Sequence, residues 1–427
     1  MYLGVFEQMI DPDLVVRDVE SYRDFAVRFL GEIVSIPTVS PWGEGYEEFA
    51  RVSKELLESM GVSVEIHRVP QEYVDPRVPP EGRGKARYIV IARIGSRDNV
   101  TLHFNGHYDV VPGGPGWSVT EPFKPRIVDG KLYGRGTTDM KGGIAAIATA
   151  MASLSKHVDR LGIGVEAVFV PDEEIGGSTG TGYVVEKGMV RSRYVVIAEP
   201  SGLGQIYIGH KGAVWGEVVV KGRTGHGSTP WLGVNAFDKA TLIARKMFDE
   251  LVPRIEAKKS KYTYDLEEGN KATIMIGGYL KGGEKINQIP GEVVFSFDRR
   301  LIVEESIEDA WREIKEFIED TARKVGADVE LRLVHKMEPV VVDPGSRIFG
   351  AIEKAAETVL GARPRKIVCI GGLDMRYYVA AGYEAATYGP GVLGTAHTPD
   401  EYIEIEDMVS ASKIYSLLPL ILSSKGS

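Results

Sequence analysis

The sequence has little cysteine and little glutamine, and it lacks a long apolar run. Cys369 is the single cysteine, so no disulfide can form within the chain, and residues 1–13 carry acids where a secretory leader has a basic and then an apolar stretch. We therefore expect a protein of the reducing cytoplasm. The longest run of small and apolar residues, 142–154, is too short to cross a bilayer, which predicts a buried helix and no membrane partner. The scarcity of glutamine is typical of proteins from heat-loving organisms.

The charge balance excludes another class of partner. The chain has 51 basic and 60 acidic residues, a net charge of −9, and the two signs are interspersed. Nucleic-acid binders concentrate Lys and Arg on one surface, so no nucleic-acid partner is expected. A length of 427 residues exceeds the size of one hydrophobic core, which predicts two domains.

The first half of the chain alternates helical and strand patterns. Apolar spacing predicts helices at 22–34 and 47–60, whereas short β-rich runs predict strands at 88–93, 101–105 and 165–171. Alternation of this kind is typical of an α/β domain in which helices flank a mixed, mostly parallel sheet.

The pattern changes after residue 211 and returns near residue 338. Between these positions the order of expected elements is βαββαβ, which is typical of a small ferredoxin-like α+β domain with its helices on one face. The expected elements are strand 214–221, helix 235–251, strands 272–280 and 292–303, helix 307–325 and strand 328–334. We therefore predict a catalytic domain formed by 1–210 and 338–427, with 211–337 inserted into it.

His107 and Asp109 follow directly after the apolar strand 101–105. Residues two apart at a strand end can point to the same side, and a histidine with a carboxylate beside it is a common metal-ligand arrangement. A turn histidine followed by an Asx-turn aspartate is the alternative.

Asp139 stands between a glycine-rich segment and the helical pattern that begins at Met140. A carboxylate at such a junction can offer one oxygen to each of two cations. It can equally cap the helix that follows. Neither phosphate-loop pattern, G-x-G-x-x-G or G-x-x-x-x-G-K-[ST], occurs in this segment.

Further carboxylates and a second histidine follow other strands. Asp172, Glu173 and Glu174 end one apolar run, Glu199 ends another, and His397 lies in a loop near the C-terminus. Adjacent carboxylates repel one another, so such a cluster needs a cation or a shared proton, unless it is a solvated loop. Two histidines and several carboxylates at strand ends suit a pair of zinc-like ions.

At these residues the chain resembles the M20 metallopeptidase family. That family includes acetylornithine deacetylase, succinyl-diaminopimelate desuccinylase, aminoacylase-1, carboxypeptidase G2 and the carnosine dipeptidases. The matching motifs occur in family order along essentially the whole chain: GHYDVVP, GRGTTDMKGG, PDEEIGG, AEP and HTPDEYI.

The resemblance implies two divalent metal ions, zinc or cobalt, with Asp139 bridging them. It assigns His107, Asp139 and Glu199 to one ion, and Asp139, Glu174 and His397 to the other. Asp109 would orient His107, and Glu173 would be the general base that moves a proton from water to the leaving amine.

The resemblance also assigns roles in the inserted domain. His226, in the sequence GHGSTP, would reach the site of a second subunit and stabilise the oxyanion, which implies a homodimer joined through 211–337. The residues expected to bind a substrate carboxylate are Asn287, Arg300, Gly371, Gly372 and Arg376. Arginine suits this task because its planar fork donates two parallel hydrogen bonds, although surface salt bridges are the alternative. Leu373 departs from the small hydroxyl residue of many deacylases.

The resulting hypothesis is a deacylase that removes an acetyl or succinyl group from an N-acyl amino acid. A dipeptidase or carboxypeptidase would use the same metal site. A catalytically silent scaffold is the alternative from another class, and the presence of Glu173 argues against it.

Overall fold

A computed structural model describes residues 11–161 and 163–424 and divides the chain into two compact units. Unit 1 comprises the chain up to Ile208, Val342–Lys366 and the chain from Tyr377, whereas unit 2 comprises Gly209–Val341 and Ile367–Arg376. The prediction that no secretory leader is present falls mainly on residues 1–10, outside the described residues. None of the described helices combines the length and apolarity needed to span a membrane.

Unit 1 is built around a mixed sheet with the strand order β1-β2-β6-β3-β7-β17-β8. The central neighbours β6, β3, β7 and β17 run parallel, and the outer pairs β1–β2, β2–β6 and β17–β8 are antiparallel. The predicted α/β class with a largely parallel sheet is confirmed. The strands that lie in or cross into unit 1 are β1 (Ser63–Arg68), β2 (Tyr88–Gly95), β3 (Val100–His107), β4 (Arg126–Val128), β5 (Lys131–Tyr133), β6 (Gly164–Val170), β7 (Tyr194–Ile197), β8 (Gln205–His210), β16 (Arg365–Cys369), β17 (Glu384–Thr387) and β18 (Tyr402–Glu404).

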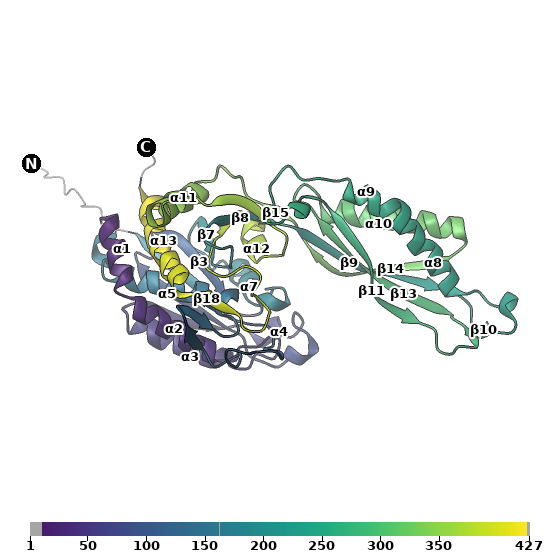
Figure 1. Cartoon of the computed structure of the whole chain (residues 1–427), viewed down its shortest axis with the longest axis horizontal. Helices are drawn as coiled ribbons and strands as arrows, with labels where there is room; N and C mark the ends of the chain where they lie inside the picture. Colours follow the sequence, from purple (N-terminus) through teal and green to yellow (C-terminus); the bar gives the residue numbers. More distant parts are fainter. Residues whose placement is uncertain (1–10, 162, 425–427) are drawn as a thin grey trace, which may run out of the picture. The chain divides into compact units, whose positions relative to one another are not determined.

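Helices cover this sheet. The helices that lie in or cross into unit 1 are α1 (Pro12–Glu20), α2 (Arg23–Ser35), α3 (Tyr46–Glu58), α4 (Gln71–Val74), α5 (Gly142–Ser155), α6 (Val158–Leu161), α7 (Thr181–Glu186), α11 (Arg347–Leu360), α12 (Met375–Ala380) and α13 (Ile405–Ser423). Residues 142–154 of α5 are all buried, as the sequence predicts, and α5 packs against α13, α2 and β3 (Figure 1).

Glycine lets α5 approach the sheet closely. A Cβ atom on Gly143 would lie 2.2 Å from the carbonyl oxygen of Ala198, and one on Gly142 would lie 2.4 Å from that of Thr137. Gly143 therefore lets the start of α5 lie against the residue that follows β7, next to Glu199, whereas Gly142 leaves room for the preceding turn.

Unit 2 is a four-stranded antiparallel sheet of order β11-β13-β9-β14, with α8 and α10 packed against it. Its elements in chain order are β9 (Gly212–Lys221), β10 (Gly225–His226), α8 (Ala236–Lys246), α9 (Val252–Glu256), β11 (Thr273–Gly282), β12 (Gln288–Ile289), β13 (Glu292–Leu301), α10 (Ile307–Val325), β14 (Asp328–Met337) and β15 (Val340–Val341). The helices lie on one side of the sheet (Figure 1), and the ferredoxin-like βαββαβ order is confirmed.

One expected helix is longer than predicted, and one long helix was not expected. The helix expected at 235–251 runs on to Glu256 through a wider turn at Met247–Leu251, because Pro253 stands in the first turn of α9, where a missing N–H is tolerated. Helix α13 is absent from the sequence prediction. It is buried along most of its length and contains Pro419, so it shows no amphipathic stripe that periodicity could detect.

Candidate metal centre

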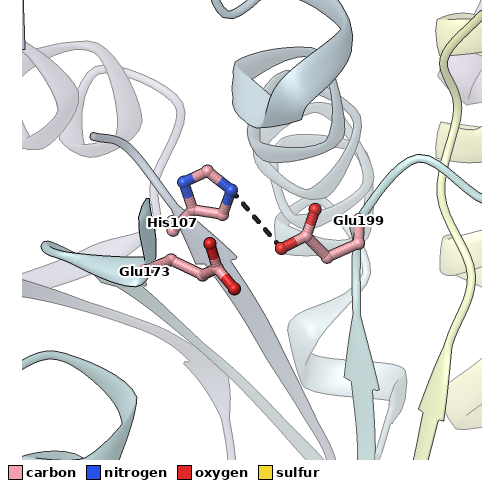
Figure 2. Close-up of side chains that lie close together, drawn as sticks. All are labelled: His107, Glu173 and Glu199. Atoms are coloured by element: carbon pink, nitrogen blue, oxygen red, sulfur yellow. Dashed lines mark ion pairs between the residues drawn. The ribbon is translucent and has the colours of Figure 1, made fainter. Parts of the chain in front are cut away.

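The site in unit 1 lies where parallel strands end together. In the sheet register His107 of β3 lies opposite Val170 of β6, and Asn105 lies opposite Ile197 of β7. The residues that follow β6 and β7 therefore meet the end of β3 at one edge of the sheet, which brings Glu173 and Glu199 to His107 (Figure 2).

His107 is almost fully buried and lies among carboxylates. Its Nε2 atom is 3.1 Å from Asp139 Oδ1 and 3.3 Å from Glu199 Oε1. Its Nδ1 atom is 3.0 Å from the backbone carbonyl of Asp109 and 3.4 Å from that residue's Oδ1. Asp109 thus fixes the ring chiefly through its main chain, which leaves Nε2 directed at the acids.

The carboxylate of Asp109 has a second task. Its Oδ1 accepts the backbone N–H of Glu173 at 3.0 Å, and its Oδ2 accepts that of Glu174 at 3.1 Å. One buried side chain therefore joins the segment after β3 to the short turn Glu173–Ile175 that follows β6.

Asp139 lies between the two histidines. Its Oδ1 faces His107 at 3.1 Å, and its Oδ2 faces His397 Nε2 at 3.3 Å. The same histidine atom is 3.0 Å from Glu174 Oε1. Asp139 is not the N-cap residue of α5, because the helix begins at Gly142 and Lys141 occupies that position.

Glu401, a residue that the sequence reasoning did not assign, holds the Asp139 loop. One carboxylate oxygen accepts the N–H groups of Thr138 and Asp139 at 2.9 and 3.0 Å. The other accepts the N–H of Gly136 at 3.0 Å and pairs with Arg135 at 2.6 Å. Its place four residues after His397 is the only sequence signal for this role.

The two groups of side chains fit metal ions. Ligand atoms of His107, Glu173 and Glu199 lie within 4.8 Å of one another, as do those of Asp139, Glu174 and His397. Asp139 also reaches the first group through its contact with His107. Because Glu173 belongs to the first group, its carboxylate lies close enough to a metal ion held there to act as a ligand or as a base.

The electrostatics of both groups favour added positive charge. Burial would lower the pKa of His107, but the carboxylates of Glu199, Asp109 and Asp139 raise it well above its ordinary value. Hydrogen bonds to Asp139 and Glu174 raise the pKa of His397 to about 10. Acids that stabilise a proton so strongly on imidazole would equally stabilise a divalent cation there, so the donor set fits the implied metals.

The residues expected to bind substrate lie in unit 2. His226 on β10 is exposed, with Nδ1 at 2.7 Å from the hydroxyl of Ser228. Across the β10–β12 pair His226 lies opposite Gln288, and the carbonyl of the preceding residue, Asn287, accepts the N–H of Gly227 at 2.8 Å. The structure thus places Asn287 one position away from the residue that pairs with His226.

The arginines form a second group in unit 2. Arg300 makes a two-armed contact with Asp298 at 2.8 and 2.9 Å and lies 5.8 Å from the ring centre of Trp215. Arg376 donates to the carbonyl of Leu373 at 2.9 Å, in the loop that also holds Gly371 and Gly372. Burial lowers the pKa of His335, and the positive charges of Arg376 and Arg300 lower it further.

Sequence comparison relates this chain to a peptidase family and to known metallohydrolases. Residues 103–420 match the family model described as Peptidase family M20/M25/M40. An uncharacterised metallohydrolase of Methanocaldococcus jannaschii is 28% identical over 411 residues, which cover 91% of this chain and 97% of that protein. Succinyl-diaminopimelate desuccinylase of Nitrosococcus oceani is 31% identical over 351 residues, which cover 77% of this chain and 88% of the enzyme.

Solved structures share the fold. The dipeptidase Dug1p of Saccharomyces cerevisiae superimposes with a TM-score of 0.73 at 18% identity, covering 98% of this chain and 99% of its own. The M20 family metallo-carboxypeptidase Sso-CP2 of Sulfolobus solfataricus gives a TM-score of 0.71 at 22% identity, covering 93% and 99%.

Proposed function

The chain belongs to peptidase family M20/M25/M40, and on that premise we propose that it removes an acetyl or succinyl group from an N-acylated amino acid. The family identifies it as a metal-dependent hydrolase of amide or peptide bonds, and it confirms the resemblance drawn from the motifs. The observation that carries the proposal is the position of Asp139, with one oxygen toward each histidine, together with the position of Glu173 near His107 and Glu199.

We assign two divalent ions, zinc or cobalt, to this site. His107, Asp139 and Glu199 would hold one ion, and Asp139, Glu174 and His397 the other. Bound there, the ions supply Lewis acidity that polarises the scissile carbonyl and lowers the pKa of the attacking water.

Glu173 is the proposed general base. Its carboxylate lies within 4.8 Å of ligand atoms of His107 and Glu199, so it can take a proton from water and return it to the leaving amine nitrogen. The carboxylate of Asp109 accepts the backbone N–H of Glu173, which holds the backbone of Glu173 in place for this transfer.

Unit 2 supplies the proposed substrate contacts. Arg300 and Arg376 would bind the substrate carboxylate together with Asn287 and the Gly371–Gly372 loop. His226 would stabilise the oxyanion in the site of a second subunit, within a homodimer joined through unit 2. The small-molecule substrate, the dimer and the cytoplasmic location all belong to the proposal.

A dipeptidase or carboxypeptidase activity is the second candidate. The structures that share this fold include the dipeptidase and the metallo-carboxypeptidase named above, and Leu373 replaces the hydroxyl residue of many deacylases. A silent scaffold would have no need of Glu173 or of a complete ligand set.

A substrate panel tests these alternatives. Zinc-loaded protein would be assayed on N-acetyl amino acids, N-succinyl amino acids and dipeptides, and the kcat/KM values compared. We expect the acylated amino acids to give the highest values. Preference for dipeptides would support the second candidate, and no turnover on any member with metal bound would support the scaffold.

A further inference from the structure

A buried ion pair lies under the turn that carries Glu173 and Glu174. The side chains of Arg87 and Asp172 are 0% and 1% exposed, and Arg87 Nε is 2.5 Å from Asp172 Oδ2. The hydroxyl of Tyr46 donates to Oδ1 at 3.0 Å, and the hydroxyl of Thr179 donates to Oδ2. Asp172, the first of the three adjacent acids, is thus satisfied by the chain's own donors, with Arg87 as its cation.

The same guanidinium reaches the other side of the site. Arg87 Nη2 donates to the carbonyl of Pro41 at 2.6 Å. Pro41 follows a segment that pairs with the backbone just after His107, where Val39 bridges Val110. Arg87 therefore connects the turn of the proposed base to the segment that supports the first histidine.

The surrounding backbone leaves space for a guanidinium in this place. Gly43 has a φ of +70°, and a Cβ atom on it would lie 2.5 Å from Arg87 Nη1. A Cβ atom on Gly82 would lie 3.0 Å from Nη2 and 2.7 Å from the carbonyl oxygen of Pro41. Side chains at either position would collide with the arginine or with the carbonyl that it binds.

We propose that Arg87 is a positioning residue that, through Asp172, sets the geometry of the turn that carries the proposed base Glu173 and the proposed metal ligand Glu174. Asp172 has a φ of 65°, a left-handed conformation that is uncommon outside glycine. Its side chain is held by Arg87, and the next two amides are held by Asp109, so the turn is fixed from both sides. This inference rests on the metal site of the proposed function.

The test is zinc affinity, measured on the full chain by competition with a chelator. Arg87→Lys keeps the positive charge, but a lysine lacks the planar guanidinium that donates to Asp172 and to the carbonyl of Pro41 at the same time. We expect this variant to bind zinc about 10- to 100-fold more weakly and to have a lower kcat. The double variant Arg87→Met with Asp172→Asn removes both charges but keeps at position 172 a residue that tolerates a φ of 65° and can still hydrogen-bond to Tyr46 and Thr179. Replacing a buried ion pair by neutral side chains can keep stability, so we expect near-native thermal unfolding but the same loss of affinity.

Glu166→Gln is the matched control. It removes the negative charge from a second buried pair of unit 1, in which Glu166 lies 2.9 Å from His103 and both side chains are 0% exposed. We expect it to lower the unfolding temperature and to leave zinc affinity unchanged. If the double variant does not fold, Arg87→Lys and this control decide the question.

Two results would overturn the role of Arg87. The first is a folded Arg87→Lys variant whose zinc affinity and kcat equal those of the wild type. The second is a loss of zinc affinity in Glu166→Gln as large as that in the Arg87 variants, which would indicate general destabilisation. Wild-type protein that binds no zinc would instead refute the proposed function, and this inference with it.

Discussion

Asp109 accepts the backbone N–H of Glu173 on Oδ1 at 3.0 Å. Its other oxygen accepts the next amide, and its main-chain carbonyl faces His107. A residue expected only to orient a histidine therefore also fixes the acidic turn, so its loss should disturb both sides of the site.

Asp109→Asn tests this double role. An asparagine has one acceptor oxygen for two N–H donors, so one buried amide would face an NH₂ group. We expect metal affinity or kcat to fall about 10- to 100-fold. The measurements are chelator competition and steady-state kinetics, with Asp159→Asn on an exposed helix position as the control. If Asp109→Asn and Asp159→Asn gave the same metal affinity and kcat, the proposed role of the Asp109 side chain in holding the acidic turn would be wrong.

Glu173→Gln separates a base from a ligand. We expect both metal ions to remain bound while kcat falls by about 10²- to 10⁴-fold, because proton transfer is lost but coordination is not. Elemental analysis and kinetics on the same sample provide the measurement. Since Glu173 lies within ligand distance of His107 and Glu199, loss of one ion would reassign it as a ligand.

His226→Ala tests the histidine from a second subunit. We expect a loss of about 10²- to 10³-fold in kcat, as for an oxyanion donor, with metal content and dimer unchanged. Mixing this variant with Glu173→Gln and allowing the subunits to exchange should restore activity. In a mixed dimer, one site combines Glu173 of the first subunit with His226 of the second and is therefore complete. Random exchange would make about a quarter of the sites complete. Absence of any recovery, with exchange verified, would argue against a crossing histidine.

The motifs predicted most of the metal centre because strand ends concentrate its residues. His107, the acids after β6 and Glu199 each follow an apolar strand, and parallel pairing brings such ends together. No such pattern in the sequence indicated the roles of Glu401 and Arg87. Their partners Arg135 and Asp172 are 266 and 85 positions away, so only the fold reveals these contacts.

Secondary structure was predictable where the pattern was amphipathic or clearly alternating. Helix α10 runs over Ile307–Val325, as its spacing predicts, since one face packs on the sheet of unit 2 and the other is exposed. Helix α13 has no such contrast, because it is buried on nearly all sides. The domain boundaries and the assigned site roles stay predictions.

His210 predicts a pH dependence of stability in unit 2. Burial lowers its pKa to about 3, so the folded chain stays unprotonated there while the unfolded chain takes up a proton below about pH 6.5. The contribution of neutral His210 to the free energy of unfolding is therefore complete above about pH 6.5. As the pH falls toward 3, the free energy of unfolding decreases by about 1.4 kcal/mol per pH unit. We expect wild-type protein to lose about 2 kcal/mol relative to His210→Gln between about pH 6 and pH 4.5.

Urea unfolding of both proteins in chelator provides the measurement, because chelator removes the pH dependence of metal binding from the comparison. A difference in unfolding free energy that stays constant over this range would contradict the neutral, buried state of His210.

The most direct test of the account is metal content measured together with turnover. Full-length protein would be stripped with chelator, analysed for metal, reloaded with zinc or cobalt and assayed on N-acetyl and N-succinyl amino acids. We predict about two ions per chain, with turnover lost on stripping and restored on reloading. Folded protein that takes up neither metal, or that keeps full turnover when stripped, would contradict a dinuclear hydrolase centred on Asp139.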